Sequence, residues 1–358
     1  MHVLHVVGAR PNFMKVAPVL DDLRCYPQVR QTLVHTGQHY DVNMSDVFFQ
    51  QLGLPAPDFN LEVGSGSHAQ QTAQILARFE PVVLEQKPDV VLVYGDVNST
   101  VAAALVCAKL LIPVGHVEAG LRSGDRTMPE EINRLVTDQI ADYLFTPSLD
   151  GNANLAREGV GAEKIHFVGN VMIDTLIRLL PAAEQSPILD TMRLAPSGYG
   201  LVTLHRPSNV DDPEELSALM GALDELAIRL PLVFPVHPRT RHRIGAARIG
   251  KSNDQLHLID PVSYLDFIAL QRGARFVITD SGGVQEETTW LGVPCLTLRA
   301  NTERPVTVTQ GTNQLLGRDT GLLKAAVVQI LEGRGKQGTI PPLWDGHAGE
   351  RIAAILVA

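Results

Sequence analysis

Short runs of apolar, mostly β-branched residues recur along the chain, and most are followed by a turn and a longer amphipathic segment. This alternation is typical of parallel βαβ units, in which a buried strand is followed by a helix that covers the sheet. In the first half, the predicted strands are 3–7, 32–35, 90–94, 114–117, 143–146 and 165–168. In the second half, they are 200–204, 232–236, 256–259, 276–279 and 295–298. The pattern therefore predicts an α/β protein with two sets of strands.

The segment 181–198 separates the two sets of strands. It is rich in Pro, Ala and Ser and has no clear periodicity, so we expect the crossover between two domains in it or just before it. The length of 358 residues also favours two domains. We predict a first domain over 1–175 and a second over 176–358. The last segment, 346–357, has a helical pattern and could pack on either domain.

Composition and charge narrow the possible functions. Hydrophobic residues make up 45% of the chain and charged residues 19%, as in ordinary globular proteins. The formal net charge of -9 argues against a nucleic-acid partner, because such proteins normally carry a basic stripe. The longest apolar stretch, 101–117, is interrupted by Lys109 and Pro113 and is too short for a membrane helix. We therefore expect neither nucleic acid nor membrane as a partner.

The cysteines and the N-terminal residues bear on the cellular compartment. Cys25, Cys107 and Cys295 are far apart and form no C-x-x-C motif, which is typical of a reducing cytoplasm. The residues 2–7 lack a basic region before them and indicate a first strand, not a signal peptide. We expect a cytoplasmic protein with three buried thiols.

The turn after the first strand has features of a phosphate site. Ligands of open α/β sheets bind beyond the carboxyl ends of the strands, so the residues at these ends are the first candidates. Here the sequence is GARPNFMK, in which Pro11 favours a helix start and Arg10 and Lys15 supply positive charge near it. Solvated surface charges are the structural alternative. The dinucleotide motif G-x-G-x-x-G is absent.

Three acidic residues of the first half are candidates for proton transfer. Asp96 and Glu118 each follow a predicted strand, and Glu130 lies in the first turn of a predicted helix. Asp96 could instead be an N-cap, and Glu130 and its neighbour Glu131 could instead stabilise the helix dipole. At one edge of a sheet, however, grouped carboxylates are the usual equipment for moving protons.

In the second half, several predicted strands are followed by residues that suit a diphosphate. His205 follows one strand in TLHRPSN, and His237 follows another in PVHPR. In TDSGGVQEE, the residues Ser281, Gly282 and Gly283 open a helix whose free amides can hold a diphosphate. A tight strand–helix turn would explain the glycines but not the acids that follow them.

Two further residues extend this candidate site. Glu287, one turn into the same helix, could hold ribose hydroxyls. Arg304, in TERP, adds a cation after the next strand, although a long solvated arginine is the alternative. The segment HTGQHYD contains His35 and His39, but Gly37 favours a loop and no matching ligand set accompanies them, so we expect no metal.

Nine segments in order closely resemble the non-hydrolysing UDP-N-acetylglucosamine 2-epimerases. They are GARPNFMK, TGQHYD, YGDVNST, HVEAGLRS, MPEEINR, TLHRPSN, PVHP, TDSGGVQEE and TERP, and they span nearly the whole chain. The resemblance implies two Rossmann-like domains of the glycosyltransferase-B type, like those of UDP-glycosyltransferases and glycogen phosphorylase, with a cleft between them. It also implies a homodimer that interconverts UDP-N-acetylglucosamine and UDP-N-acetylmannosamine without a cofactor, for polysaccharide biosynthesis.

The resemblance also implies roles for individual residues. The family's functional positions fall on Arg10, Lys15, Asp96, Glu118, Glu130, His205, Ser281, Gly282, Gly283, Glu287 and Arg304. Phe267 matches the aromatic residue that packs on uridine, and Gln38 and His39 match a region that is regulatory in some relatives. One departure is Ser208, which stands where many members have an acid in H-R-x-E-N.

The chemistry of the implied reaction favours elimination. Carbon 2 of the sugar has no adjacent carbonyl, so direct deprotonation would give an unstabilised carbanion. Loss of UDP from carbon 1 with the carbon 2 proton gives a neutral glycal instead. We expect the acids and His205 to serve proton transfer and departure of UDP. A modified UDP-sugar as substrate, a glycosyltransferase, a hydrolysing epimerase and a sugar-nucleotide sensor remain alternatives.

Overall fold

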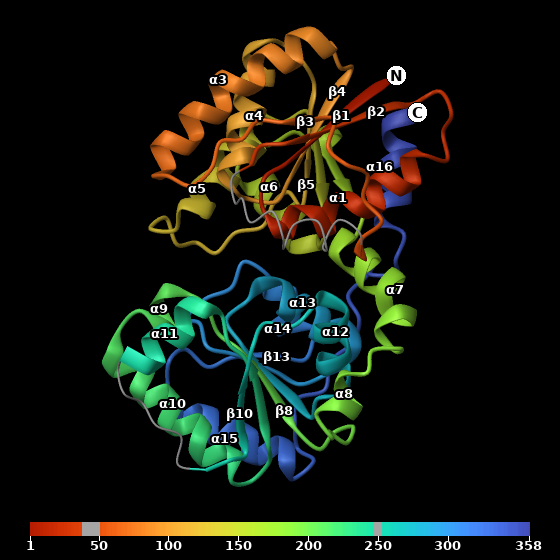
Figure 1. Cartoon of the computed structure of the whole chain (residues 1–358). Helices are drawn as coiled ribbons and strands as arrows, with labels where there is room; N and C mark the ends of the chain where they lie inside the picture. Colours follow the sequence, from red (N-terminus) through yellow and green to blue (C-terminus); the bar gives the residue numbers. More distant parts are fainter. Residues whose placement is uncertain (38–50, 247–252) are drawn as a thin grey trace. The chain divides into compact units, whose positions relative to one another are not determined.

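The computed structural model describes residues 1–37, 51–246 and 253–358, and the chain divides into two compact units. Unit 1 consists of residues 1–178 together with 342–358, and unit 2 consists of residues 179–341. Each unit has its own parallel sheet with helices around it (Figure 1). The candidate regulatory residues Gln38 and His39 lie outside the described residues.

Unit 1 is built on a parallel sheet with the strand order β3-β2-β1-β4-β5-β6-β7. The strands are β1 (His2–Val7), β2 (Arg30–His35), β3 (Phe59–Asn60), β4 (Val90–Tyr94), β5 (Val114–Val117), β6 (Tyr143–Thr146) and β7 (Ile165–Phe167). The helices are α1 (Arg10–Leu23), α3 (His68–Gln86), α4 (Asn98–Lys109), α5 (Pro129–Ile140), α6 (Leu149–Arg157), α16 (Ala348–Val357) and α7 (Val171–Ala183), whose residues 179–183 belong to unit 2. The order reverses between β1 and β4, which is the switch point where Rossmann-type sheets bind ligands.

Unit 2 repeats this arrangement with the strand order β10-β9-β8-β11-β12-β13. The strands are β8 (Gly200–Thr203), β9 (Leu232–Pro235), β10 (Leu256–Ile259), β11 (Phe276–Thr279), β12 (Cys295–Thr297) and β13 (Asn313–Leu315). The helices are α8 (Ile188–Thr191), α9 (Pro207–Val210), α10 (Pro213–Ala227), α11 (Pro238–Ala246), α12 (Tyr264–Gly273), α13 (Gly282–Leu291), α14 (Pro305–Thr309) and α15 (Thr320–Leu331). Its switch point lies between β8 and β11.

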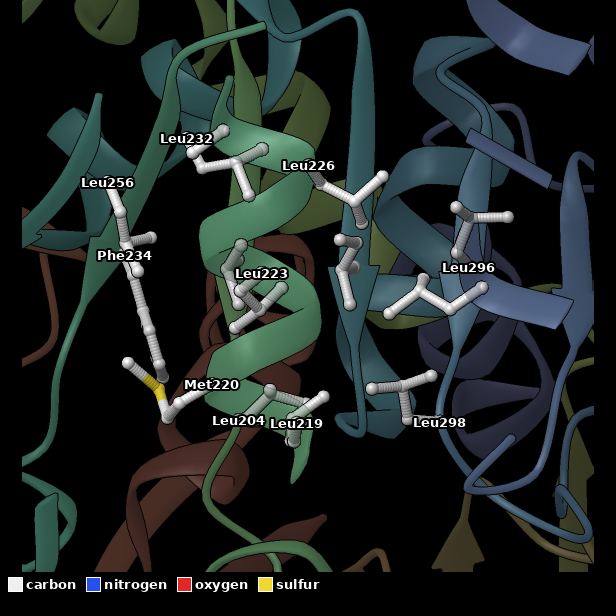
Figure 2. Packing of buried hydrophobic residues seen from close by; sticks show 14 of the residues in the cluster. Leu204, Leu219, Met220, Leu223, Leu226, Leu232, Phe234, Leu256, Leu296 and Leu298 are labelled. Atoms are coloured by element: carbon white, nitrogen blue, oxygen red, sulfur yellow. The ribbon is translucent and has the colours of Figure 1, made fainter. Parts of the chain in front are cut away.

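Helix α10 illustrates how the sequence builds these layers. Its N-cap Asp212 accepts hydrogen bonds from two amides of the first turn, and Pro213 fits the first helical position. Apolar residues then recur at helical spacing, and Met220 lies beside the sheet residue Phe234 (Figure 2), while Leu223 belongs to the same buried cluster. The largest buried cluster of unit 2 therefore lies between one face of the sheet and its covering helices.

The predicted strands all form, with ends that differ by at most two residues from the prediction. Two short strands, β3 and β13, were not predicted because two or three residues are too few to show a period. The expectation of three buried thiols is wrong, since Cys25 is exposed in the turn that follows α1. In the described part of the chain, no helix is long and apolar enough to cross a bilayer.

The C-terminal helix α16 belongs to unit 1 and lies beside α1 (Figure 1). Its N-cap residue, His347, provides no side-chain cap, but the amide of Gly349 in its first turn donates to Asp174 Oδ2 at 2.8 Å. Asp174 lies on α7 and is fully buried. A carboxyl group from another helix thus satisfies a donor that would otherwise be unpaired at the start of α16.

Burial raises the pKa of Asp174 from 3.8 to about 6, despite the hydrogen bonds from α16. The unfolded carboxyl ionises near pH 3.8, while the folded one keeps its proton until about pH 6, so stability falls as the pH rises between these values. Above pH 6 the penalty is fully present. Asp174→Asn keeps an acceptor oxygen for Gly349 and removes the charge.

We therefore expect Asp174→Asn to raise the free energy of unfolding at pH 7.5 by about 2–3 kcal/mol, and to change it little at pH 4. Urea denaturation at the two pH values measures both differences. If Asp174→Asn were less stable than the parent at pH 7.5, the conclusion that the buried Asp174 charge destabilises the fold would be wrong.

Candidate functional site

The turn between β1 and α1 is tied to the end of β4 across the switch point of unit 1. The amides of Gly8 and Ala9 both donate to Asn12 Oδ1 at 3.0 Å, and Asn12 Nδ2 donates to the carbonyl of Tyr94 at 2.8 Å. A Cβ atom on Gly8 would lie 2.0 Å from Ser99 Oγ, so only glycine fits there. The predicted phosphate turn is therefore fixed in place by buried hydrogen bonds.

Lys15 and Glu118 form an ion pair at this edge of the sheet. Lys15 Nζ donates to Glu118 Oε2, and their side chains are only 5% and 4% exposed. A Cβ atom on Gly95 would lie 2.5 Å from Lys15 Nζ and 3.1 Å from Glu118 Oε2, so the pair lies directly against the turn after β4. Lys15 is thus paired with a carboxylate, not solvated as in the structural alternative.

Glu118 also has an unusual backbone conformation. Its φ of 76° lies in the left-handed region, which costs energy for a residue with a Cβ atom. Its amide and that of Ala119 both donate to the carbonyl of Phe145 on β6. Such strain is most often retained at functional sites, where the surrounding structure enforces it.

Asp96 is held by Arg134 of α5. Arg134 Nη1 donates to Asp96 Oδ2 at 2.5 Å, and Asn133 Nδ2 donates to the Asp96 carbonyl at 2.8 Å. The N-cap of α4 is Val97, so Asp96 is not the N-cap that the structural alternative proposed. The Asp96 side chain is 26% exposed. Asp96 is thus oriented by a buried cation and still open on one side.

Of the two adjacent acids on α5, Glu131 is buried and Glu130 is half-buried. Glu131 accepts from Arg134 at 2.5 Å and from the amides of Ser123 and Gly124 at 3.0 and 2.9 Å. Burial alone would raise the pKa of Glu131, but these donors outweigh it and lower the pKa. Glu131 therefore fixes the loop before α5, which leaves Glu130 as the acid of this pair that is open for other contacts.

In unit 2, Asp280 joins the ends of β8 and β11. It is fully buried, and its oxygens accept from the amides of His205 and Arg206 at 3.0 and 2.9 Å and from Asn209 Nδ2 at 3.0 Å. His205 Nδ1 lies 3.0 Å from Asp280 Oδ1, while the His205 side chain is 54% exposed. Burial would raise the pKa of Asp280, but His205 and the other donors lower it. The carboxylate thus orients the ring so that Nε2 points away from it.

A cluster of charges lies beside the start of α13. Arg304 contacts Glu286 Oε1 at 3.0 Å and Glu303 Oε1 at 2.5 Å, and Arg299 contacts Glu303 Oε2 at 2.7 Å. Burial opposes ionisation of Glu303, but the arginines hold its pKa far below its usual range. A Cβ atom on Gly282 would lie 2.5 Å from Arg304 Nη1, so the arginine packs on the first turn of α13. Arg304 thus lies against the first turn of α13 while it is paired with Glu286 and Glu303, and the diphosphate site expected here stays a prediction.

Glu287 and Phe267 lie farther along this region. Glu287 is buried, and its two oxygens accept from Tyr264 Oη and Gln271 Nε2, each at 2.6 Å. Burial raises the pKa of Glu287. Phe267 is half-buried against the cluster on the other face of the sheet of unit 2. His237 is exposed just after β9.

The structure brings some of the predicted residues together within each unit. In unit 1, Lys15, Glu118 and the turn before Asp96 form one group. In unit 2, His205 is joined through Asp280 to the helix start at Ser281, and Gly282 contacts Arg304. Ser281 is the N-cap of α13, and Gly283 lies in its first turn. Arg10 begins α1, and its side chain lies outside the described part of the chain.

Sequence reasoning assigned no role to Arg134 or Asp280, which hold Asp96 and His205. The signals were present, because Arg134 lies one helical turn after Glu131 and Asp280 directly follows a buried strand. Among the described residues, no group of three or more His, Cys, Asp or Glu is arranged to hold a metal ion.

Comparison with known proteins identifies similar chains over the whole length. The family model described as UDP-N-acetylglucosamine 2-epimerase matches residues 21–357. The UDP-N-acetylglucosamine 2-epimerase of Methanocaldococcus jannaschii is 43% identical over 98% of this chain and 97% of its own. The UDP-2,3-diacetamido-2,3-dideoxy-D-glucuronate 2-epimerase of Pseudomonas aeruginosa is 43% identical over 99% of both chains.

Solved structures agree with this similarity. The crystal structure of the Methanocaldococcus jannaschii UDP-GlcNAc 2-epimerase in complex with UDP-GlcNAc and UDP has a TM-score of 0.91 and 42% identity, and covers 100% of this chain and 99% of its own. The UDP-GlcNAc 2-epimerase from Neisseria meningitidis bound to UDP-GlcNAc has a TM-score of 0.90 and 32% identity, with 100% coverage of both chains. Each match extends through both units.

The contacts of Asp280 predict the effect of neutralising it. Asp280→Asn keeps the size of the side chain but replaces one acceptor oxygen with a donor. We expect His205 to lose its fixed Nδ1–H tautomer and unit 2 to lose about 2 kcal/mol of stability. Nitrogen NMR of the histidine rings and urea denaturation measure the two effects.

Asp260→Asn is the matched control, because the Asp260 side chain is 91% exposed and its ion pair is with Arg241, which is itself exposed. Its stability is expected to change by less than about 0.5 kcal/mol. An unchanged His205 tautomer in Asp280→Asn would contradict the orienting role of Asp280.

Proposed function

The chain belongs to the UDP-N-acetylglucosamine 2-epimerase family, and on that premise we propose that it interconverts UDP-N-acetylglucosamine and UDP-N-acetylmannosamine. It is an isomerase with the two-sheet α/β fold of that family. The observation that carries the substrate is the whole-chain similarity to an epimerase solved with UDP-GlcNAc and UDP. The groups of unit 1 and unit 2 described above suit the two parts of this reaction.

The proposed reaction proceeds by elimination and re-addition. A base removes the proton from carbon 2, the electron pair forms the carbon 1–carbon 2 double bond, and the bond from carbon 1 to the UDP oxygen breaks. The products are 2-acetamidoglucal and UDP. Return of a proton to the opposite face of carbon 2, with attack of UDP on carbon 1, gives the epimer. No carbanion has to be stabilised by a carbonyl.

Unit 1 is proposed to supply the proton-transfer groups. Asp96 is partly exposed and oriented by Arg134, so it can act as an acid or base without losing its position. Glu118 is strained and paired with Lys15, and Glu130 is half-buried on the neighbouring helix. We assign proton transfer to Asp96 with Glu118 or Glu130.

Unit 2 is proposed to bind UDP. The amides of Gly282 and Gly283, which follow the N-cap Ser281, and the guanidinium of Arg304 suit the diphosphate, on which negative charge grows as carbon 1 is released. His205, oriented by Asp280, is suited to assist this departure.

Other contacts to UDP are proposed by the same family resemblance. Phe267 suits packing on uridine, Glu287 suits the ribose hydroxyls, and His237 lies after a neighbouring strand of the same sheet. Arg10 and Lys15 of unit 1 are proposed to contribute positive charge toward the diphosphate. No metal or redox cofactor takes part in the proposed reaction.

A related substrate is the second candidate. The similarity to the Pseudomonas aeruginosa enzyme, whose name gives a diacetamido glucuronate sugar, equals that to the Methanocaldococcus jannaschii epimerase. Family models and solved structures favour the simpler sugar. We further propose that the protein is a homodimer in the cytoplasm and that it supplies a precursor for polysaccharide synthesis.

The elimination mechanism predicts exchange at carbon 2. In deuterated water, UDP-N-acetylglucosamine is expected to yield UDP-N-acetylmannosamine with deuterium at carbon 2, because the proton that returns comes from a group in exchange with solvent. Proton NMR and mass spectrometry of the products measure the label. Epimer without deuterium would exclude the mechanism, and turnover of only the diacetamido glucuronate sugar would reassign the substrate. Conversion only with an added sugar acceptor would instead indicate a glycosyltransferase.

The role of Asp96 predicts a loss of turnover without loss of UDP binding. Asp96→Asn keeps an oxygen for Arg134 but lowers the capacity for proton transfer, so we expect kcat to fall about 10²- to 10⁴-fold. The Kd for UDP, measured by calorimetry, should change by less than about threefold, which corresponds to less than about 1 kcal/mol of binding free energy. Glu80→Gln, an exposed acid on α3, is the control and should retain full activity. If Asp96→Asn kept full activity, Asp96 would not take part in proton transfer and its role would be structural.

A further inference from the structure

His116 is a fully buried residue on β5, two positions before Glu118. Its Nδ1 lies 2.6 Å from Asp138 Oδ1 on α5, and its Nε2 lies 2.7 Å from the carbonyl oxygen of Gly95. Both distances are those of good hydrogen bonds. The ring therefore lies between the helix α5 and the turn that carries Asp96.

The chemistry of the two partners determines how the ring is protonated. A neutral imidazole has one donor and one acceptor nitrogen, whereas an imidazolium has two donors. The carbonyl oxygen of Gly95 can only accept. Asp138 is also an acceptor, because its other oxygen takes hydrogen bonds from the amide of Gly120 at 3.0 Å and contacts Arg122 at 2.7 Å. Burial would raise the pKa of Asp138, but His116 and Arg122 lower it.

A charged ring also suits the ion pairs around it. Arg122 also contacts Glu158 Oε2 at 2.6 Å, so Asp138 and Glu158 both face the guanidinium, and Asp138 also contacts the imidazole of His116. Two negative charges thus meet two positive charges when His116 carries both protons. The other charged groups at this edge interact among themselves: Lys15 pairs with Glu118, and Arg134 contacts both Asp96 and Glu131.

This cluster connects the three segments that carry the proposed catalytic acids. Gly95 immediately precedes Asp96, Gly120 follows Glu118 by two residues, and Asp138 lies on the helix that begins beside Glu130. We propose that His116 is a positioning residue, held as a doubly protonated imidazolium, that fixes the turn before Asp96 and the loop after Glu118 for epimerisation. The inference rests on the proposed roles of these acids.

The same sheet provides an internal control in His5 on β1. His5 is also fully buried, and its nitrogens contact Tyr94 Oη at 2.7 Å and Gln31 Oε1 at 3.1 Å. The hydroxyl of Tyr94 can donate or accept, so a neutral ring satisfies both bonds. Burial lowers the pKa of His5 from 6.5 to about 3. The two buried histidines therefore should differ in charge.

Nitrogen NMR of the histidine rings in the full-length protein tests the protonation state directly. At pH 7.5, His116 is expected to carry protons on both ring nitrogens and His5 on only one. In Asp138→Asn, His116 should change to a ring with a single proton, because its anionic partner is gone. A single ring proton on His116 in the unaltered protein would overturn the proposal, and this measurement does not depend on which sugar the enzyme uses.

Kinetics of two matched variants test the positioning role. His116→Gln cannot donate to Asp138 and Gly95 together, so we expect kcat to fall about 10- to 100-fold with KM within about twofold, as for a small displacement of catalytic groups. His5→Gln removes a buried histidine of the same sheet and should change kcat less than about twofold. Each rate is normalised to the folded fraction measured by circular dichroism.

The outcomes separate this proposal from the catalytic assignments. Equal losses of kcat in the two variants, or full activity of His116→Gln, would overturn the positioning role. If His116→Gln does not fold, the NMR spectrum of the unaltered protein decides the question. If His116 carries two protons and its variant loses turnover while Asp96→Asn is fully active, the cluster positions Glu118 and the role proposed for Asp96 fails instead.

Discussion

The pairing of buried charges at the ends of parallel strands is the constraint on which the rest of the structure depends. Isolated charges in a protein interior cost several kcal/mol or more, so they persist only with partners. In unit 1, Lys15 pairs with Glu118, and Arg134 joins Asp96 to Glu131. These pairs do not add much net stability. They do restrict where each carboxylate can lie before a substrate arrives.

In unit 2, a single buried carboxylate, Asp280, is paired with several hydrogen-bond donors at the switch point. Asp280 gathers the donors that follow β8, and it leaves one nitrogen of His205 directed away from itself. Beside it, Arg304 balances Glu286 and Glu303 while it lies against the first turn of α13. The two units therefore have related strand orders, and each gathers paired charges at its switch point. In unit 1, Lys15 and Arg134 hold the acids, and in unit 2, Asp280 and the Arg304 cluster lie beside the start of α13.

The strands could be predicted well because a buried parallel strand appears in the sequence as a short run of apolar residues bounded by turn residues. The strands from β4 to β6 have the predicted bounds for this reason. Candidate residues after the strands were found by position and chemistry. Their partners were not, since the contacts of Asp96 with Arg134 and of His205 with Asp280 join residues 38 and 75 positions apart. Hydrophobic periodicity carries no information about such pairs.

The location of α16 has a consequence for the synthesis of the chain. Unit 1 is completed by residues 342–358, which emerge from the ribosome only after all of unit 2. Until then, α1 lacks its contacts with α16, and Asp174 lacks the hydrogen bond from the Gly349 amide at the start of that helix. Unit 2 is continuous in sequence and can complete its fold first. The order in which the two cores close is thus the reverse of the order in which they begin, and a truncation at the C-terminus damages the unit that was made first.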